Sequence, residues 1–330
     1  MSLTFIGMLL GLLVDVMLAA KLGTSQGADA LIIALSLPLL IDTVTREGTN
    51  FSMVPLIMER RANLSEVEFR HFASSLINLA LALGIVLTIL LEALAPWLAA
   101  SLAPGFSVEG KAEATILLRV CAPLVIFAPG ITVLSVLLNS RKRFSLAALR
   151  NTMAPAIVAV TICLTWNREH TVLWVAVAYA VGFAAFFLSL FLCAKHTGHQ
   201  HNWFAWVLRD DLARLWQTNS LPTLGFIMRQ SSRLVERQLA SLVAVGGVSA
   251  YYFAFRIFSA VQTLVGSSIA TTSLPRMAEH GLVGNRTKLG AALRKNLIKV
   301  IVLTVPGAVL ILLFHGEIIS WVYGRGSFGQ

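Results

Sequence analysis

Three arginines in an apolar run are the residues of this sequence best suited to chemistry. The stretch Pro222 to Leu242, PTLGFIMRQSSRLVERQLASL, is typical of a membrane-spanning helix except that it carries Arg229, Arg233, Arg237 and Glu236. The spacing i, i+4, i+8 places the three guanidinium groups on one helix face over about 12 Å. Because an arginine at bilayer depth costs from about 2.5 kcal/mol upward, such residues usually face a bundle interior or a water-filled cavity and mark a substrate path.

The composition indicates which class of protein surrounds these arginines. Hydrophobic residues make up 57% of the 330 residues and charged residues only 13%, about half the charged fraction of a soluble domain. The chain is therefore predicted to be an all-α, polytopic membrane helical bundle. Its three cysteines lie in apolar runs without CxxC spacing, so no disulfide framework or metal ligand set is expected from them.

Apolar runs of suitable length predict nine membrane spans. They are Leu3 to Leu22, Ala30 to Met58, Phe72 to Leu94, Ala114 to Leu138, Met153 to Trp166, Thr171 to Ala194, Leu221 to Val245, Ala250 to Leu274 and Leu297 to Phe314.

The basic residues between these spans fall almost entirely in alternate loops. One set of loops holds Arg60, Arg61, Arg70, Arg141, Lys142, Arg143, Arg150, Lys195, Arg209, Arg214, Arg276, Arg286, Lys288, Arg294 and Lys295, and the other set holds only Lys111 and Arg168. By the positive-inside rule this asymmetry predicts a multi-pass membrane protein with a cytoplasmic N-terminus. The net charge of +10 is then a topology signal, and no nucleic-acid partner is expected. The histidines of KHTGHQH lack acidic or cysteine partners at ligand spacing, so no metal site is expected there either.

An internal repeat is the next prediction. A shift of about 220 residues lays Leu13 to Gly23 on Leu234 to Ala244, and it lays Asp15 on Glu236. The same shift brings APGF near GRGSF, although a chance match between leucine-rich helices is the alternative. We expect an N-terminal lobe of six helices over 1–195, an amphipathic linker over 196–220 and a partial second lobe over 221–330. Within the linker, WFAWVLRDDLARLW (Trp203 to Trp216) is predicted to form an interfacial helix.

Several segments, in order and with family-like spacing, carry a resemblance to a known family. GLLVDVMLAAKLGTSQGADALIIALSLPLL followed by REGTNFSMVPLI, then APGF, LLN with RF, and YYFAFRIF leading to SLP, resemble the MurJ/MviN family of lipid II flippases. That family lies in a superfamily with MATE drug exporters and polysaccharide flippases. The resemblance implies a cationic cavity between two lobes that holds the diphosphate of an undecaprenyl-linked precursor.

Individual positions follow or depart from the family pattern. Asp15 matches the acidic residue of a G-x-x-R-D motif, Asp29 the one that opens helix two, Glu47 an E-G pair, and Arg256 an arginine of helix eight. The family has two arginines on helix one, and this chain has Met8 and Val14 at those positions. The family has one arginine on helix two, and this chain has Asp42 there, followed one turn later by Arg46.

These departures suggest that the anion-binding surface has moved across the cavity to the second lobe. The predicted substrate-binding residues are Arg229, Arg233, Arg237, Arg256 and Arg46. The predicted gate or charge-balancing residues are Asp15, Asp29, Asp42, Glu47 and Glu236. A static network of buried ion pairs without a substrate role is the alternative, because intramembrane charges commonly pair with one another.

The function implied is a flippase that moves lipid II, or another lipid-linked diphosphate sugar precursor, by alternating access. No Walker A, HExxH or G-x-S-x-G motif is present, so no enzyme and no cofactor are expected. An ion gradient or the membrane potential would then supply the energy. The alternatives are an exopolysaccharide or O-antigen repeat-unit flippase, a MATE-like cation antiporter and a non-transporting membrane scaffold.

Overall fold

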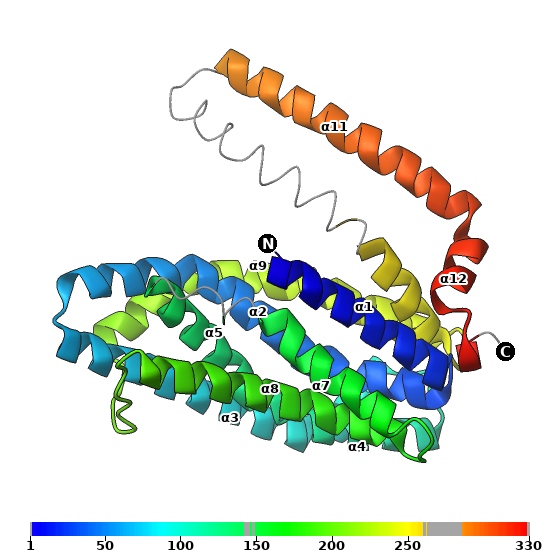
Figure 1. The fold of residues 1–330 in the computed structure, drawn as a ribbon, viewed down its shortest axis with the longest axis horizontal. Helices are drawn as coiled ribbons and strands as arrows, with labels where there is room; N and C mark the ends of the chain where they lie inside the picture. The colour runs from blue at the N-terminus through cyan, green and yellow to red at the C-terminus, as the bar shows by residue number, and fades with distance from the viewer. Residues whose placement is uncertain (1, 142–145, 147–148, 260–261, 263–285, 329–330) are drawn as a thin grey trace.

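The computed structural model describes residues 2–141, 146, 149–259, 262 and 286–328, and throughout this part of the chain the regular structure is helical (Figure 1). The helices are α1 (Ser2–Leu22), α2 (Gln26–Asn63), α3 (Glu66–Leu102), α4 (Val108–Cys121), α5 (Leu124–Ser140), α7 (Arg150–Leu164), α8 (Thr171–His196), α9 (Arg209–Ser241), α11 (Arg286–Leu313), α12 (His315–Tyr323) and the 3-10 turn η1 (Gly326–Phe328). A further helical segment is described over 247–259. The predicted all-helical fold is confirmed.

Local sequence signals set several of the helix ends. The hydroxyl of Ser25 accepts a hydrogen bond from the Ala28 N–H at 3.2 Å and so caps α2. Ser65 and Glu68 form a reciprocal capping box at the start of α3. The predicted span Ala114 to Leu138 is two helices, because α4 ends at Cys121 and α5 begins just after Pro123, whose ring nitrogen has no proton to donate.

Within the part of the chain that the structure describes, five helical stretches are long and apolar enough to cross a membrane. They are Gln26–Gly48, Glu66–Leu102, Val108–Ser140, Thr171–His196 and Leu293–Leu313, and Arg150–Leu164 is a shorter apolar helix. The predicted span Ala250 to Leu274 is described as helix over 250–259 and at residue 262, and its other residues lie outside the described part of the chain.

Helices α1 to α8 pack as one bundle, which we call the first lobe, and α9 runs along α2 on its flank (Figure 1). One hydrophobic cluster includes Leu31 and Leu118, and a second, nearer the other end of the bundle, includes Leu76 and Leu134. Helix α11 stands apart from the bundle and leads into α12.

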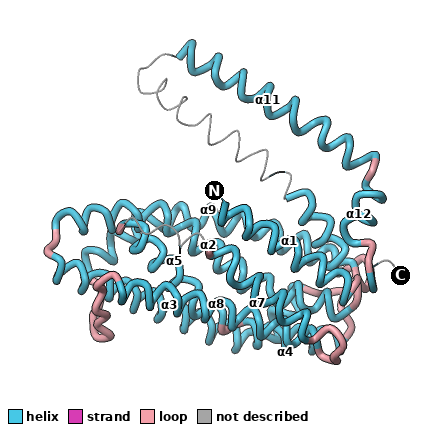
Figure 2. The backbone as a smooth tube through the Cα atoms, in the orientation of Figure 1, coloured by secondary structure: helices cyan, strands magenta, loops and turns pink. Residues whose placement is uncertain are grey.

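The prediction of an interfacial helix over Trp203 to Trp216 is wrong for the first half of that segment. Residues 203–208 are not helical, and α9 begins only at Arg209 and continues without a break to Ser241 (Figure 2). The reason is a side chain of α3: the Asn78 Nδ2 donates to the carbonyls of Asn202, Trp203 and Ala205 at 2.9, 3.1 and 2.9 Å. These carbonyls would otherwise accept the hydrogen bonds of a helix, so tertiary contacts override the amphipathic pattern.

The first turns of α9 are tied to the first lobe. Asp211 of α9 forms an ion pair with Arg60 of α2, and Arg214 binds Glu59 through two hydrogen bonds of 2.9 and 2.6 Å. Leu215 is buried in the second hydrophobic cluster. The predicted linker 196–220 is therefore a loop followed by part of a helix that packs on α2.

At the other end of the bundle, the two halves of the chain make the same kind of glycine contact with each other, once in each direction. Gly105 approaches the backbone of Ser241 so closely that an added Cβ would meet the Ser241 carbonyl, and Gly326 approaches Ala20 in the same way. Gly326 lies 221 positions after Gly105, and Ser241 lies 221 positions after Ala20. The predicted repeat thus has a counterpart in space, where each half packs its glycine on the other half's first helix.

Candidate functional site

The three arginines of α9 face α2 and the segment 247–259. Arg229 forms an ion pair with Glu47 of α2, and its guanidinium lies 5.2 Å from the ring centre of Phe226. Arg233 lies 5.3 Å from the ring centre of Phe255. The helical periodicity of α9 therefore places these two guanidinium groups on the face predicted from the sequence.

Arg237 lies deepest of the three. Its Nη1 donates to the hydroxyl of Ser36 in α2 at 2.5 Å, and its guanidinium lies 5.8 Å from the ring centre of Tyr252. Ser36 is itself buried and donates to the Ile32 carbonyl, so its oxygen is free to accept from the arginine. The pair joins α9 to the middle of the first lobe.

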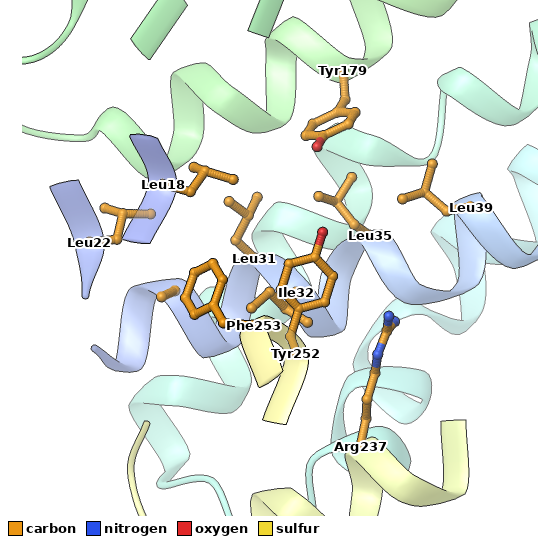
Figure 3. Close-up of a pocket in the computed structure, with 11 residues that line it drawn as sticks. Leu18, Leu22, Leu31, Ile32, Leu35, Leu39, Tyr179, Arg237, Tyr252 and Phe253 are labelled. Atoms are coloured by element: carbon orange, nitrogen blue, oxygen red, sulfur yellow. The ribbon is translucent and has the colours of Figure 1, made fainter. Parts of the chain in front are cut away.

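Arg237 is the cationic residue of a small cavity (Figure 3). The lining is otherwise apolar or aromatic, and the hydroxyl groups of Tyr179 and Tyr252 point toward the same space. The cavity volume is about 40 Å³, which is room for a few water molecules and too little for a diphosphate. The site must widen before it can hold an anion of that size.

Asp15 pairs with Arg256 and not with the arginines of α9. Its carboxylate is 2% exposed, accepts from the Arg256 Nε at 2.5 Å and from the Tyr252 hydroxyl at 2.9 Å. A buried carboxylate is tolerated when it is paired and hydrogen-bonded in this way. The contact links α1 to the segment 247–259.

Asp42 pairs with an arginine that the sequence analysis did not select. Arg150, the first residue of α7, forms the ion pair with Asp42 and also donates to the Thr132 hydroxyl at 3.1 Å. From the sequence, Arg150 is interpreted only as a topology signal. Its partner Asp42 lies 108 residues earlier in the chain, and no local pattern indicates a contact over that distance. Its place one turn before an apolar run was the available signal.

Arg46 of α2 carries a buried donor atom that is not used in the described part of the chain. Its Nε is buried and, within the described residues, has no hydrogen-bond partner. Arg150 lies close enough to Arg46 for the two like charges to repel each other. Since Asp42 is already paired with Arg150, the group formed by Asp42, Arg150 and Arg46 carries a net positive charge.

The remaining two predicted gate residues do not contact arginines in the described ion pairs. Asp29 of α2 accepts hydrogen bonds from the N–H groups of Gly246 and Ser249, both at 2.7 Å. It thereby caps the helix that begins at residue 247, where unpaired N–H groups and the helix dipole favour a carboxylate. Glu236 accepts a hydrogen bond from the Tyr251 hydroxyl. The five predicted acids are thus divided between ion pairing and hydrogen bonding.

No cluster of three or more potential metal-ligating side chains is found in the described ranges. Cys121, Cys163 and Cys193 are all free thiols. The arginines and carboxylates described above are suited to the recognition of charged groups.

Comparison with known proteins assigns the family. Residues 18–330 match the family model described as lipid II flippase MurJ. The chain is 24% identical over 329 residues to a probable lipid II flippase MurJ of Rickettsia prowazekii, covering 99% of this chain and 64% of that protein. It is 24% identical over 334 residues to the lipid II flippase MurJ of Burkholderia cenocepacia, covering 98% and 64%. The chain therefore spans about two thirds of the length of these relatives.

Solved structures show the same fold. A lipid II flippase MurJ in an inward closed conformation superposes with a TM-score of 0.83 at 21% identity, covering 99% of this chain and 67% of that one. An inward-facing MATE family multidrug resistance transporter of the MOP superfamily gives a TM-score of 0.76 at 15% identity, covering 97% and 73%. The family match over nearly the whole chain confirms the resemblance found in the sequence, and the protein belongs to the MurJ family of lipid II flippases.

Proposed function

We propose that this protein carries a lipid-linked diphosphate sugar, the peptidoglycan precursor lipid II, across the bacterial inner membrane by alternating access. The observation that carries the proposal is the arginine ladder, by which we mean Arg229, Arg233 and Arg237. It runs from a narrow cavity at Arg237 to Arg229, whose side chain is 62% exposed. Arginine suits a diphosphate because it stays charged and can donate two parallel hydrogen bonds to phosphate oxygens.

The contacts of the ladder suit a site that releases its arginines to a ligand. The Arg229–Glu47 pair is partly exposed, and an exposed ion pair contributes little, about 0–1 kcal/mol. A diphosphate carries more charge than one carboxylate and can displace Glu47. Arg46, which lacks a hydrogen bond at its Nε among the described residues, adds a cation on the α2 side.

The proposed orientation puts the N-terminus of α1 in the cytoplasm, as the basic loops predict. The loop between α1 and α2 then lies on the outer side, together with Asp29 and the two glycine contacts of Gly105 and Gly326. These contacts hold the lobes together at the outer end and would have to separate for outward release. An ion gradient or the membrane potential is the proposed energy source.

A flippase for an exopolysaccharide or O-antigen repeat unit is the second candidate. Val14, at a position where the resemblance leads us to expect an arginine, is 2% exposed and forms part of the hydrophobic core. The first lobe thus supplies less positive charge at α1 than the family pattern requires, which favours a cargo with a different headgroup. A MATE-like cation antiporter is less well supported, since Asp15 is engaged by Arg256 and Asp29 by backbone N–H groups.

Reconstitution into liposomes with a fluorescent lipid II tests the proposal. Replacing Arg233 or Arg237 with Ala should slow flipping by at least about tenfold, equivalent to about 1.4 kcal/mol, and Lys should restore part of the rate. Arg294→Ala, on the exposed part of α11, is the matched control and should leave the rate unchanged.

Unchanged flipping in both alanine variants would overturn the anion-binding role of the ladder. Repeating the assay with an undecaprenyl-diphosphate repeat-unit glycolipid separates the two candidate cargos, because faster transport of that lipid than of lipid II would favour the second.

A further inference from the structure

The loop between α8 and α9 has a fixed shape that transport does not explain. After α8 ends at His196, the chain turns back along α3: the Asn202 N–H donates to the Ser74 hydroxyl at 3.1 Å, and Asn78 binds the next carbonyls. Ser74 and Asn78 are one turn apart, and Asn78 is about 18 Å along α3 from its first residue, Glu66, at 1.5 Å per residue. The loop therefore runs from the end of the bundle back toward its middle.

The same loop holds its shape through internal contacts as well. The Asn202 side-chain oxygen accepts from the Phe204 N–H at 3.0 Å, and Ala205 is fully buried. The ring of His201 lies edge-on to Trp203, with 4.3 Å between ring centres, and 5.3 Å from Phe191 of α8. A loop with this many fixed points is not a loose connection.

The side chains of three large aromatic residues are nevertheless mostly exposed. Trp203 is 63% exposed, Phe204 87% and Trp206 72%. Large exposed aromatic side chains this close together in the chain are typical of a surface that contacts a membrane or another protein. The loop projects from the side of the bundle, beside the ends of α3 and α8 (Figures 1 and 2).

The surroundings of the rings favour lipid over protein. Farther along α3, the side chains of Leu83, Val86 and Leu90 are also exposed, in a helix that is long and apolar enough to cross a membrane. Lys195 and Arg209 flank the loop, and both are exposed. Tryptophan next to basic residues is the pattern found where a protein meets phospholipid headgroups.

We propose that residues 203–206 form a re-entrant wedge, in which Trp203, Phe204 and Trp206 insert into the cytoplasmic leaflet while Lys195 and Arg209 contact anionic headgroups. The assignment to the cytoplasmic leaflet uses the orientation proposed above. The wedge fixes the depth at which α9 starts in the membrane, and the Arg60–Asp211 and Arg214–Glu59 pairs transmit this position to α2.

Site-directed spin labelling of the full chain in phosphatidylglycerol-containing liposomes tests the wedge. The three native cysteines are first replaced with Ala, and single cysteines are introduced at Phe204 and, separately, Trp206. Glu66→Cys supplies an exposed reference at the predicted cytoplasmic end of α3, and Leu90→Cys a reference in its exposed apolar part. Labels at 204 and 206 should collide with oxygen more than with a water-soluble nickel complex, as at position 90.

Two results would overturn the proposal. The first is nickel accessibility at both wedge positions equal to that at position 66, which would instead assign the patch to a soluble protein partner. The second is an unchanged label at 204 in the Asn78→Ala variant. We expect this variant to free the loop and to raise both the mobility and the nickel accessibility of that label. Asn63→Ala, at the end of α2, is the matched control and should leave the label unchanged. An unchanged label in the Asn78 variant would mean that the loop is not clamped as proposed.

Discussion

The carboxylate of Asp29 accepts a hydrogen bond from the N–H of Ser249, 220 residues later in the chain, at 2.7 Å. A second bond from the Gly246 N–H makes this one side chain the cap of a helix in the other half of the protein. Asp29 therefore joins the two halves of the protein through backbone groups.

Replacing Asp29 tests this junction. Asp29→Ala leaves two buried N–H groups without an acceptor, at a cost of about 1–3 kcal/mol each, so thermal unfolding in detergent should occur at a clearly lower temperature. Asp29→Asn keeps an acceptor oxygen and should lose less. An alanine variant as stable as the parent would mean that the cap contributes nothing.

Releasing Arg229 from Glu47 should strengthen anion binding. Glu47→Gln removes a partly exposed ion pair worth up to about 1 kcal/mol, so the Kd for undecaprenyl diphosphate should fall by up to about fivefold. Glu59→Gln frees Arg214 on the same helix and is the matched control. Equal or weaker binding by the Glu47 variant, measured by calorimetry, would contradict the gate role.

The Asp15–Arg256 pair should stabilise the fold, and the effects of replacing its two residues on stability should be coupled. Arg256→Ala leaves a buried carboxylate uncompensated, which typically costs about 3–5 kcal/mol. Combining it with Asp15→Asn should recover much of the stability, because the uncompensated charge is gone. If the two effects simply add in thermal unfolding experiments, the residues are not coupled.

Acidic pH should loosen the loop that carries the wedge. Burial, together with the nearby charges of His201, Arg141 and Arg70, lowers the pKa of His199 to about 4. Burial also lowers the pKa of His201. Since the unfolded loop takes up protons below about pH 6.5 and the folded loop does not, stability should be full above that pH and fall toward pH 4.

Tryptophan fluorescence between pH 7.5 and 4.5 measures this change. His199→Gln should flatten the profile, and His196→Gln, at an exposed position, should not. A pH profile that is the same in all three proteins would assign the transition to other groups.

The sequence was informative where a property is local. Apolar runs located the helices of the bundle, and the period of α9 predicted that Arg229, Arg233 and Arg237 share a face. The partners of charged residues were not predictable in the same way: Asp42 of α2 meets Arg150 at the start of α7, 108 residues later, and no periodicity encodes that distance. The pattern Trp203 to Trp216 predicted a helix because it counts only side chains of its own segment, whereas Asn78 of α3 binds the backbone.

The exchange of contacts between the two halves also affects how the protein is made. The Ser327 hydroxyl donates to the Lys21 carbonyl at 3.3 Å, across 306 residues, and Gly326 packs on Ala20. At about 5–20 residues per second, synthesis of that interval takes roughly 15–60 s. Throughout this time the C-terminal end of α1 lacks its native contact with η1. Packing at that end of the helix therefore waits for η1, and a membrane chaperone or lipid would have to cover it until then.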